Sequence, residues 1–221
     1  MSTIQADFDR IALLSNEEWN HNSHYHNFLL QHLPQHCLET LEIGCGTGAF
    51  SRLLARRSER VLAIDLSPEM IRIAVDRSRE FPNIEFMVAD ARACEFPARR
   101  FDCIVTIATL HHLPMREMLS KMKDALKVNG VLLVLDLFQP DGLQDAFKSA
   151  LALPLSTGLR LIRQHRLRAP REVRRAWAEH EQHDSYLTLA QVRELCERVL
   201  PQAEVKQHLL WRYSIIWKKL S

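Results

Sequence analysis

Short apolar runs alternate with helical patterns through the middle of the chain. The strand-like runs cover residues 40–43, 61–65, 84–88, 101–107 and 131–137. Helical patterns cover residues 50–57, 67 to about 80 and 114 to about 127, and Ser67 followed by Pro68 is a typical helix start. This alternation predicts an α/β fold whose mainly parallel sheet is covered by helices on both faces.

The two ends of the chain have different patterns. Residues 141–184 are helical in pattern and rich in arginine, and residues 187–200 form an amphipathic helical pattern. The strand-like runs 203–208 and 210–218 are joined too tightly for a helical crossover, so we expect an antiparallel hairpin at the edge of the sheet. The first 39 residues predict helices that precede the sheet and cap its ligand-binding end.

Composition narrows the class of protein. The chain has 221 residues, 47% of them hydrophobic and 25% charged, and no apolar run approaches the roughly 18 to 20 residues of a membrane helix. With no targeting pattern at the N-terminus, these features predict a cytoplasmic globular protein. Five cysteines without a C-x-x-C pair indicate neither disulfides nor zinc. His180 and His183 have a spacing compatible with metal ligation, but without a cysteine partner we expect no metal.

Three of the six glycines, Gly44, Gly46 and Gly48, lie within five residues directly after a predicted strand and before a helical pattern. Strand, glycine turn and helix together are typical of a nucleotide-type site. The loop also satisfies the loose dinucleotide fingerprint, so the glycines alone leave an NAD enzyme open. Asp65, at the end of the second strand, can accept from ribose hydroxyls of either cofactor. Asp90, after the third strand, can accept from an adenine amino group.

These motifs together resemble those of class I S-adenosylmethionine-dependent methyltransferases, which have a seven-stranded, Rossmann-like sheet. They are E-x-G-C-G-T-G at residues 42–48, I-D-L-S-P-E-M-I at 64–71, A-D-A at 89–91 and L-H-H-L at 110–113. The pattern is similar to that of the ubiquinone/menaquinone-biosynthesis type and of small-molecule O-methyltransferases. The resemblance implies a doubly wound sheet of order 3-2-1-4-5-7-6, mainly parallel with a reversed C-terminal strand.

The resemblance also implies the organisation of the chain and its cofactor site. We expect one domain, with a helical cap (1–39), a cofactor-binding core (40–137), a helical insertion or lid (138–187), and a last helix with the terminal hairpin (188–221). S-adenosylmethionine is the implied co-substrate. Its implied contacts are Glu42, Gly44, Cys45, Gly46 and Gly48 at the methionine portion, Asp65 at the ribose, Leu66, Met70, Asp90 and Ala91 at the adenine, Ala108 near the sulfonium, and Tyr25 as a lid contact.

Two histidines follow the fourth strand, where the methyl group is expected. If the acceptor is a hydroxyl, a base should remove its proton, and an imidazole suits this role because it titrates near neutral pH. We name His111 as the base with Asp136 as its orienting acid, and His112 as the second candidate. An equally open interpretation is that both histidines only shape the pocket or cap the helix that follows.

The sequence therefore predicts a methyltransferase that acts on a small-molecule or lipid-like acceptor, by O- or C-methylation. The arginine-rich span 160–175 is open to three interpretations: a solvated helix pair, a basic lid for an anionic acceptor, or a helix that touches a membrane surface. An RNA-modifying methyltransferase could use the same span to bind phosphates, although the net charge of only +2 does not favour nucleic acid. An NAD-dependent oxidoreductase and a non-catalytic binding module are the remaining alternatives.

Overall fold

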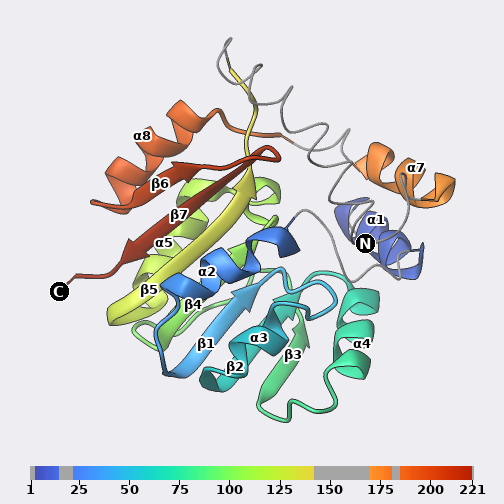
Figure 1. The fold of residues 1–221 in the computed structure, drawn as a ribbon, viewed down its shortest axis with the longest axis horizontal. Helices are drawn as coiled ribbons and strands as arrows, with labels where there is room; N and C mark the ends of the chain where they lie inside the picture. Colours follow the sequence, from blue (N-terminus) through green and yellow to red (C-terminus); the bar gives the residue numbers. More distant parts are fainter. Residues whose placement is uncertain (1–2, 15–21, 142–169, 181–184, 221) are drawn as a thin grey trace.

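A seven-stranded sheet forms the centre of the molecule (Figure 1). The computed structural model describes residues 3–14, 22–141, 170–180 and 185–220. The sheet order is β3-β2-β1-β4-β5-β7-β6; β1 to β5 are parallel, and β7 is antiparallel to both β5 and β6. This confirms the predicted order and the reversed terminal strand. The strands are β1 (Cys37–Ile43), β2 (Ser58–Asp65), β3 (Ile84–Val88), β4 (Phe101–Ile107), β5 (Leu126–Leu137), β6 (Glu204–Gln207) and β7 (Arg212–Lys218).

Helices cover both faces of the sheet and the end where the parallel strands finish (Figure 1). In the described part of the chain they are α1 (Thr3–Leu14), η1 (Ser23–Tyr25), α2 (His26–His32), α3 (Ser51–Leu54), α4 (Pro68–Arg77), η2 (Leu110–His112), α5 (Met115–Ala125), α7 (Arg171–His180) and α8 (Leu189–Val199). The helices α1 and α7 contact one another, and an Arg10–Glu179 ion pair joins them. Most of the predicted insertion, and His183, lie outside the described residues.

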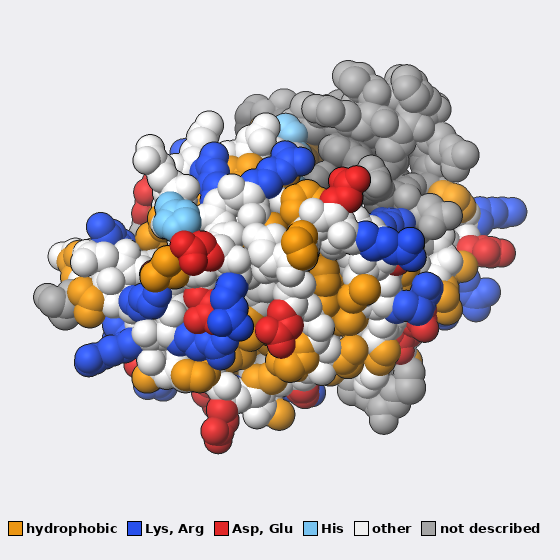
Figure 2. All heavy atoms as spheres, turned by 90° about the horizontal axis from the view of Figure 1, so that it is seen from below, with side chains coloured by type: hydrophobic (Ala, Val, Ile, Leu, Met, Phe, Trp, Pro, Cys, Tyr) orange, Lys and Arg blue, Asp and Glu red, His pale blue; other side chains and the backbone are white. Residues whose placement is uncertain are grey.

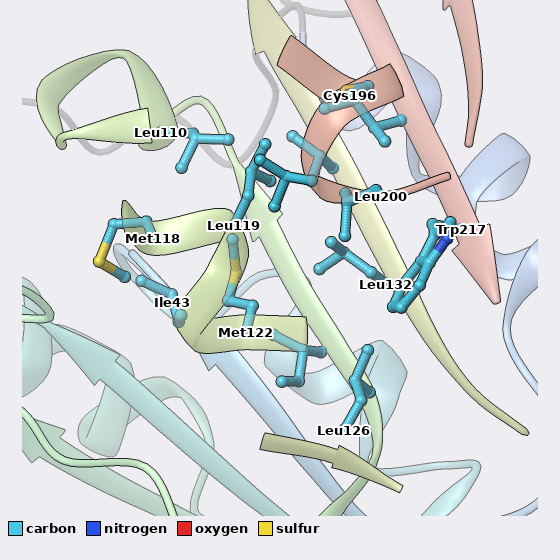
Figure 3. Close-up of a cluster of buried hydrophobic side chains, with 14 of the residues drawn as sticks. Ile43, Leu110, Met118, Leu119, Met122, Leu126, Leu132, Cys196, Leu200 and Trp217 are labelled. Atoms are coloured by element: carbon cyan, nitrogen blue, oxygen red, sulfur yellow. The ribbon is translucent and has the colours of Figure 1, made fainter. Parts of the chain in front are cut away.

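Two hydrophobic clusters lie on opposite faces of the sheet. On one face, α5 and α8 pack Leu119, Met122 and Cys196 against β5 and β7, as Figure 3 shows around Leu132 and Trp217. On the other face, α2, α3 and α4 pack against β1, β2 and β4, in a cluster that contains Leu29, Leu33, Phe50, Leu54 and Ile71. Burial on both faces explains why the central strands are nearly continuous apolar runs.

Several element boundaries differ from those predicted. The strand β1 begins at Cys37 instead of residue 40, because its first residues pair with the start of β2, and the Asp102 carboxylate accepts from the backbone N–H groups of Leu38 and Glu39. The helix α3 ends at Leu54, well before residue 57, because β2 already begins at Ser58. Residues 89–100 form turns without a helix between β3 and β4.

The strand β5 begins at Leu126, earlier than the predicted residue 131, and contains an irregularity. Phe101 pairs with Leu126, whereas Cys103 pairs with Val131, so β5 carries extra residues opposite β4. Asn129, at φ 65°, bends the chain within this irregularity. The strand therefore continues on both sides of Asn129 and begins five residues before the predicted start at residue 131.

No helix in the described part of the chain has the length and apolar character needed to cross a membrane.

A hollow of about 220 Å³ lies at the amino ends of β1 to β3, at the end of the sheet opposite the glycine loop. Its lining includes Glu39, Arg60, Glu85 and Arg100. Figure 2, seen from below Figure 1, shows acidic, basic and apolar side chains interspersed on the visible face. The described residues of that face therefore form no extended basic patch of the kind that binds nucleic acid.

Candidate active site

The three loop glycines all have positive φ, but for different reasons. A Cβ on Gly44 would lie 1.9 Å from the Thr109 Oγ1 atom, and one on Gly48 would lie 3.0 Å from the Phe86 ring. These two glycines make room for the protein's own side chains. A Cβ on Gly46, by contrast, would meet no atom within 4 Å. Gly46 is thus the glycine of this loop that faces open space, where a ligand can approach the backbone.

Asp65 holds this loop in place from the end of β2. Its Oδ2 accepts from the Gly46 N–H at 2.8 Å, and its Oδ1 accepts from the Ser67 N–H at 2.9 Å. Burial raises the pKa of Asp65, while the hydrogen bonds from Ser67 and Gly46 lower it. One carboxylate therefore ties the glycine loop to the start of α4. Its contact with a ribose stays a prediction.

Glu42 lies beneath the loop and is almost fully buried. The Ser51 hydroxyl at the start of α3 donates to its carboxyl group. Burial, together with the smaller effect of the nearby Asp65 charge, raises the pKa of Glu42 to about 8. The next loop residue, Cys45, is also buried and packs into the cluster beneath α2 and α3. Glu42 and Cys45 thus support the loop from below.

The residues predicted to contact the adenine lie in two places: Leu66 and Met70 at the start of α4, and Asp90 and Ala91 in the loop after β3. Leu66 and Met70 are half-buried, and the Met70 N–H caps α4 by donating to Ser67 Oγ at 3.1 Å. The Ser67 hydroxyl in turn donates to Asp9 Oδ1 at 2.5 Å, which brings α1 to this corner. Leu66 and Met70 therefore lie where α1, β2 and α4 meet.

Asp90 accepts several hydrogen bonds from its near neighbour Arg92. The closest involves Arg92 Nη2 and Asp90 Oδ2, at 2.7 Å, and the guanidinium holds the pKa of Asp90 below its usual range. Ala91 is buried, and its carbonyl accepts from Lys121 Nζ at 3.1 Å. Since a carboxylate oxygen has more than one lone pair, the Arg92 contact leaves Asp90 able to accept from an adenine amino group.

Asp136 pairs with His111 and not with His112. Asp136 Oδ1 lies 2.6 Å from His111 Nδ1, and Asp136 Oδ2 accepts from the His111 backbone N–H at 2.9 Å. The Leu137 N–H also donates to Oδ1, at 2.8 Å. The Asp136 side chain is fully buried and that of His111 is 7% exposed. This arrangement assigns the proton of the neutral imidazole to Nδ1 and the basic lone pair to Nε2.

Ala108 precedes these histidines in a left-handed conformation, with φ 49°. Its N–H donates to the Leu135 carbonyl at 2.7 Å, which anchors the end of β4 to β5. A left-handed alanine is strained, and such strain is common at functional sites. The turn of the chain at Ala108 leads directly into Thr109, whose side chain packs on Gly44, and then into η2.

Aromatic and imidazole rings join the candidate base to the helical cap. The His111 ring centroid lies 3.8 Å from that of His112 and 5.0 Å from that of Tyr186. The His112 ring also contacts Phe8 of α1 and His180 of α7, at 5.5 and 4.9 Å. His112 therefore faces the helices α1 and α7, whereas His111 faces the buried Asp136 carboxylate. Among the described residues, no group of three or more His, Cys, Asp or Glu side chains could hold a metal ion.

Tyr25 is buried against the turn between β6 and β7. Its hydroxyl donates to the Leu209 carbonyl at 2.6 Å, and its ring contacts those of His24 and His208. Burial raises the pKa of Tyr25 to about 12. In this structure the tyrosine fastens η1 to the terminal hairpin, and the lid contact with a cofactor stays a prediction.

Three residues near the site had no signal in the sequence. The Thr109 side chain leaves no room for a Cβ atom at position 44. Tyr186 contacts the candidate base, and Arg212 is a buried arginine at the start of β7. Each lies in a stretch whose pattern is ordinary for a turn or a strand. Only the packing of distant segments brings them to the site.

Comparison with known proteins agrees with this geometry. Residues 40–130 match the family model described as a methyltransferase domain. The matched segment runs from β1 into β5 and contains the glycine loop, Asp65, Asp90 and both histidines after β4.

The chain is similar to several methyltransferases. A protein of Mycobacterium tuberculosis, named as an uncharacterized methyltransferase, is 34% identical over 56% of this chain and 63% of its own length. The demethylmenaquinone methyltransferase of Tropheryma whipplei is 34% identical over 46% of this chain and 43% of its own. The chain thus spans less than two thirds of the length of these relatives, and the menaquinone-type likeness is distant.

A solved structure resembles the chain over its whole length. The N-methyltransferase NodS from Bradyrhizobium japonicum WM9, in complex with S-adenosyl-L-homocysteine, has a TM-score of 0.67 at 19% identity and covers 100% of both chains. At this identity the likeness concerns the fold alone.

The loop glycines should differ in their tolerance of a side chain. Gly44→Ala should lower the free energy of unfolding by about 3 kcal/mol or more, because the new Cβ overlaps Thr109 and the backbone is left-handed. Gly46→Ala, which meets only the backbone strain, should cost about 1 kcal/mol. Urea unfolding of the two variants compares them directly, and equal losses would contradict the assignment of Gly44 to Thr109.

Glu42 should make the stability of the protein depend on pH. Its pKa is raised from 4.5 to about 8 in the folded state, so the folded state binds more protons than the unfolded state between these values. The free energy of unfolding should therefore fall as pH rises from about 5 to about 8, by at most about 1.4 kcal/mol per pH unit.

The Glu42→Gln variant should lack this component, because an amide does not titrate. Urea unfolding across the same pH range measures it, and Glu80→Gln, at an exposed position, serves as the matched control. If the wild type and Glu42→Gln keep the same pH dependence, Glu42 is not the group responsible.

Proposed function

We propose that this protein is an S-adenosylmethionine-dependent methyltransferase that methylates a small-molecule or lipid-like acceptor and releases S-adenosylhomocysteine. The observation that carries the proposal is the His111–Asp136 pair at the carboxyl end of the sheet, linked through Thr109 to the glycine loop. An acceptor hydroxyl suits this pair best, because an imidazole with its lone pair on Nε2 can take the hydroxyl proton.

The residues at the glycine loop fit the proposed cofactor. Gly46 borders open space, and the half-buried Asp65 carboxylate, hydrogen-bonded to its N–H group, keeps lone pairs that can accept from ribose hydroxyls. In the proposed complex Gly46 and its neighbours hold the methionine portion, Asp65 the ribose, and Asp90 with Ala91 the adenine. When bound, the cofactor supplies an electrophilic methyl group on a sulfonium.

The protein's own contribution is then orientation, proton removal and exclusion of water. His111 takes the proton of the acceptor at Nε2, and the buried Asp136 carboxylate stabilises the imidazolium that results. The rings of Phe8, His112, His180 and Tyr186 cover this pair from α1, α7 and the segment before α8. Methylation at carbon would use the same arrangement where the acceptor carbon carries an acidic proton.

Cofactor binding tests the class of enzyme. Calorimetric titration should show that S-adenosylhomocysteine binds to the wild type, and that Asp65→Ala weakens binding at least tenfold, which corresponds to about 1.4 kcal/mol. Asp76→Ala, on the exposed side of α4, should leave the affinity unchanged. Absence of S-adenosylhomocysteine binding, or a rise in melting temperature with NADH in its place, would overturn the proposal.

The proposed base has its own test. The assay incubates enzyme, methyl-labelled cofactor and a metabolite extract, and follows labelled products by mass. His111→Ala should lower turnover about 10²- to 10⁴-fold, with cofactor affinity unchanged. His36→Ala, an exposed surface variant, controls for nonspecific loss.

The pH profile and the neighbouring histidine decide the outcome. The pH dependence of turnover should differ between the wild type and His111→Ala, because only an unprotonated imidazole accepts a proton. Equal profiles for the wild type and His111→Ala would contradict the role of His111. A larger loss in His112→Ala than in His111→Ala would reassign the base to His112.

A further inference from the structure

Arg212 is a buried arginine on the edge of the candidate site. It opens β7 and is only 8% exposed. Its Nε donates to Asn22 Oδ1 at 2.9 Å and its Nη1 donates to the Leu210 carbonyl at 2.7 Å. Both acceptors are uncharged. Among the described residues, no carboxylate forms an ion pair with this guanidinium.

A buried cation without an anion is costly. Removing a charged group from water costs several kcal/mol unless it is paired and hydrogen-bonded, and proteins rarely bury arginine otherwise. The guanidinium has five N–H donors, of which two have acceptors in the described part of the chain. Burial lowers the pKa of Arg212, in line with this poor compensation. The remaining donors are suited to a planar anion with two oxygens.

The surroundings of Arg212 place it on the acceptor side of the site. Its electrostatic neighbours are Asp136, Tyr25 and Tyr186. Asp136 and Tyr186 both contact His111, the proposed base. Asp136 does not neutralise Arg212 by direct contact, because its two oxygens accept from His111 and Leu137. The positive charge is therefore close to the reacting end of the acceptor.

We propose that Arg212 binds a carboxylate of the molecule that receives the methyl group, and so selects anionic acceptors. This inference rests on the proposed function. The carboxylate forms a bidentate pair with the guanidinium and anchors the acceptor, while His111 removes a proton from its hydroxyl. A hydroxy acid or a similar anion is thus the class of acceptor that fits the site.

A purely mechanical role for Arg212 makes a different prediction. The two hydrogen bonds also brace the turn before β7 against η1, and a brace needs no anion. Arg57 offers a matched comparison, because its Nη1 donates to the Leu30 carbonyl at 2.5 Å and braces α2. Replacing a bracing arginine should change the stability of the protein alone. Replacing an anion-binding arginine should also abolish the tighter binding of acids than of their neutral analogues.

The experiment compares acids with their amides. Calorimetric titrations with benzoate, benzamide, octanoate and octanamide are run on the full chain at saturating S-adenosylhomocysteine. We expect the wild type to bind at least one acid at least tenfold more tightly than its amide. Arg212→Gln should lose this preference and keep the affinity for S-adenosylhomocysteine, and Arg57→Gln should keep both. Arg212→Lys, which retains the charge, should keep part of the preference.

Three results would overturn the inference. They are equal binding of acids and amides by the wild type, an acid preference that survives in Arg212→Gln, and a loss of S-adenosylhomocysteine affinity in Arg212→Gln. The last result would assign Arg212 to the carboxylate of the cofactor. The wild-type comparison needs no variant, so it decides the matter even if Arg212→Gln does not fold. Failure of the wild type to bind S-adenosylhomocysteine would instead overturn the proposed function.

Discussion

Asp136 is a carboxylate that the sheet buries completely, and the geometry of the site follows from the donors that stabilise it. Burying an anion is costly, so the His111 ring, the His111 N–H and the Leu137 N–H must stay in place around it. These contacts dock η2 on the end of β5. With η2 docked, Thr109 lies against the glycine loop, and only glycine fits at position 44. The buried charge thus positions the proposed base, and through Thr109 it restricts position 44 of the loop near the proposed cofactor to glycine.

A second group of acids organises the other half of the site. Asp65 is bonded to the Gly46 N–H, Glu42 lies below it, and Asp9 reaches the same corner from α1. Burial is the main cause that raises the pKa values of Glu42 and Asp65, and repulsion from a neighbouring acid adds to it, from Asp65 on Glu42 and from Asp9 on Asp65. A cationic sulfonium would relieve this repulsion, which supports the proposed co-substrate. Arg212 supplies a positive charge on the side of the proposed acceptor.

Much of the fold followed from local patterns. The strands β3 and β4 were predicted with their correct bounds, because each is a mostly apolar run between turn residues. The start of β1 was not, because its first residues are held by pairing with β2 and by Asp102, a residue of β4. The register irregularity in β5 was also missed, since it depends on how β4 pairs with it. Boundaries set by distant partners leave no local pattern.

The sequence by itself determined the glycine loop, the acids at the ends of β2 and β3, and the pair of histidines after β4. These features depend on neighbours along the chain and on the rule that parallel strands end at one edge of the sheet. Only the tertiary structure decided that Asp136 pairs with His111 while His112 faces α1 and α7. It also decided that Thr109 leaves room only for glycine at position 44, and that Arg212 is buried. Those choices depend on hydrogen-bond geometry and packing between segments far apart in the chain, which no local spacing encodes.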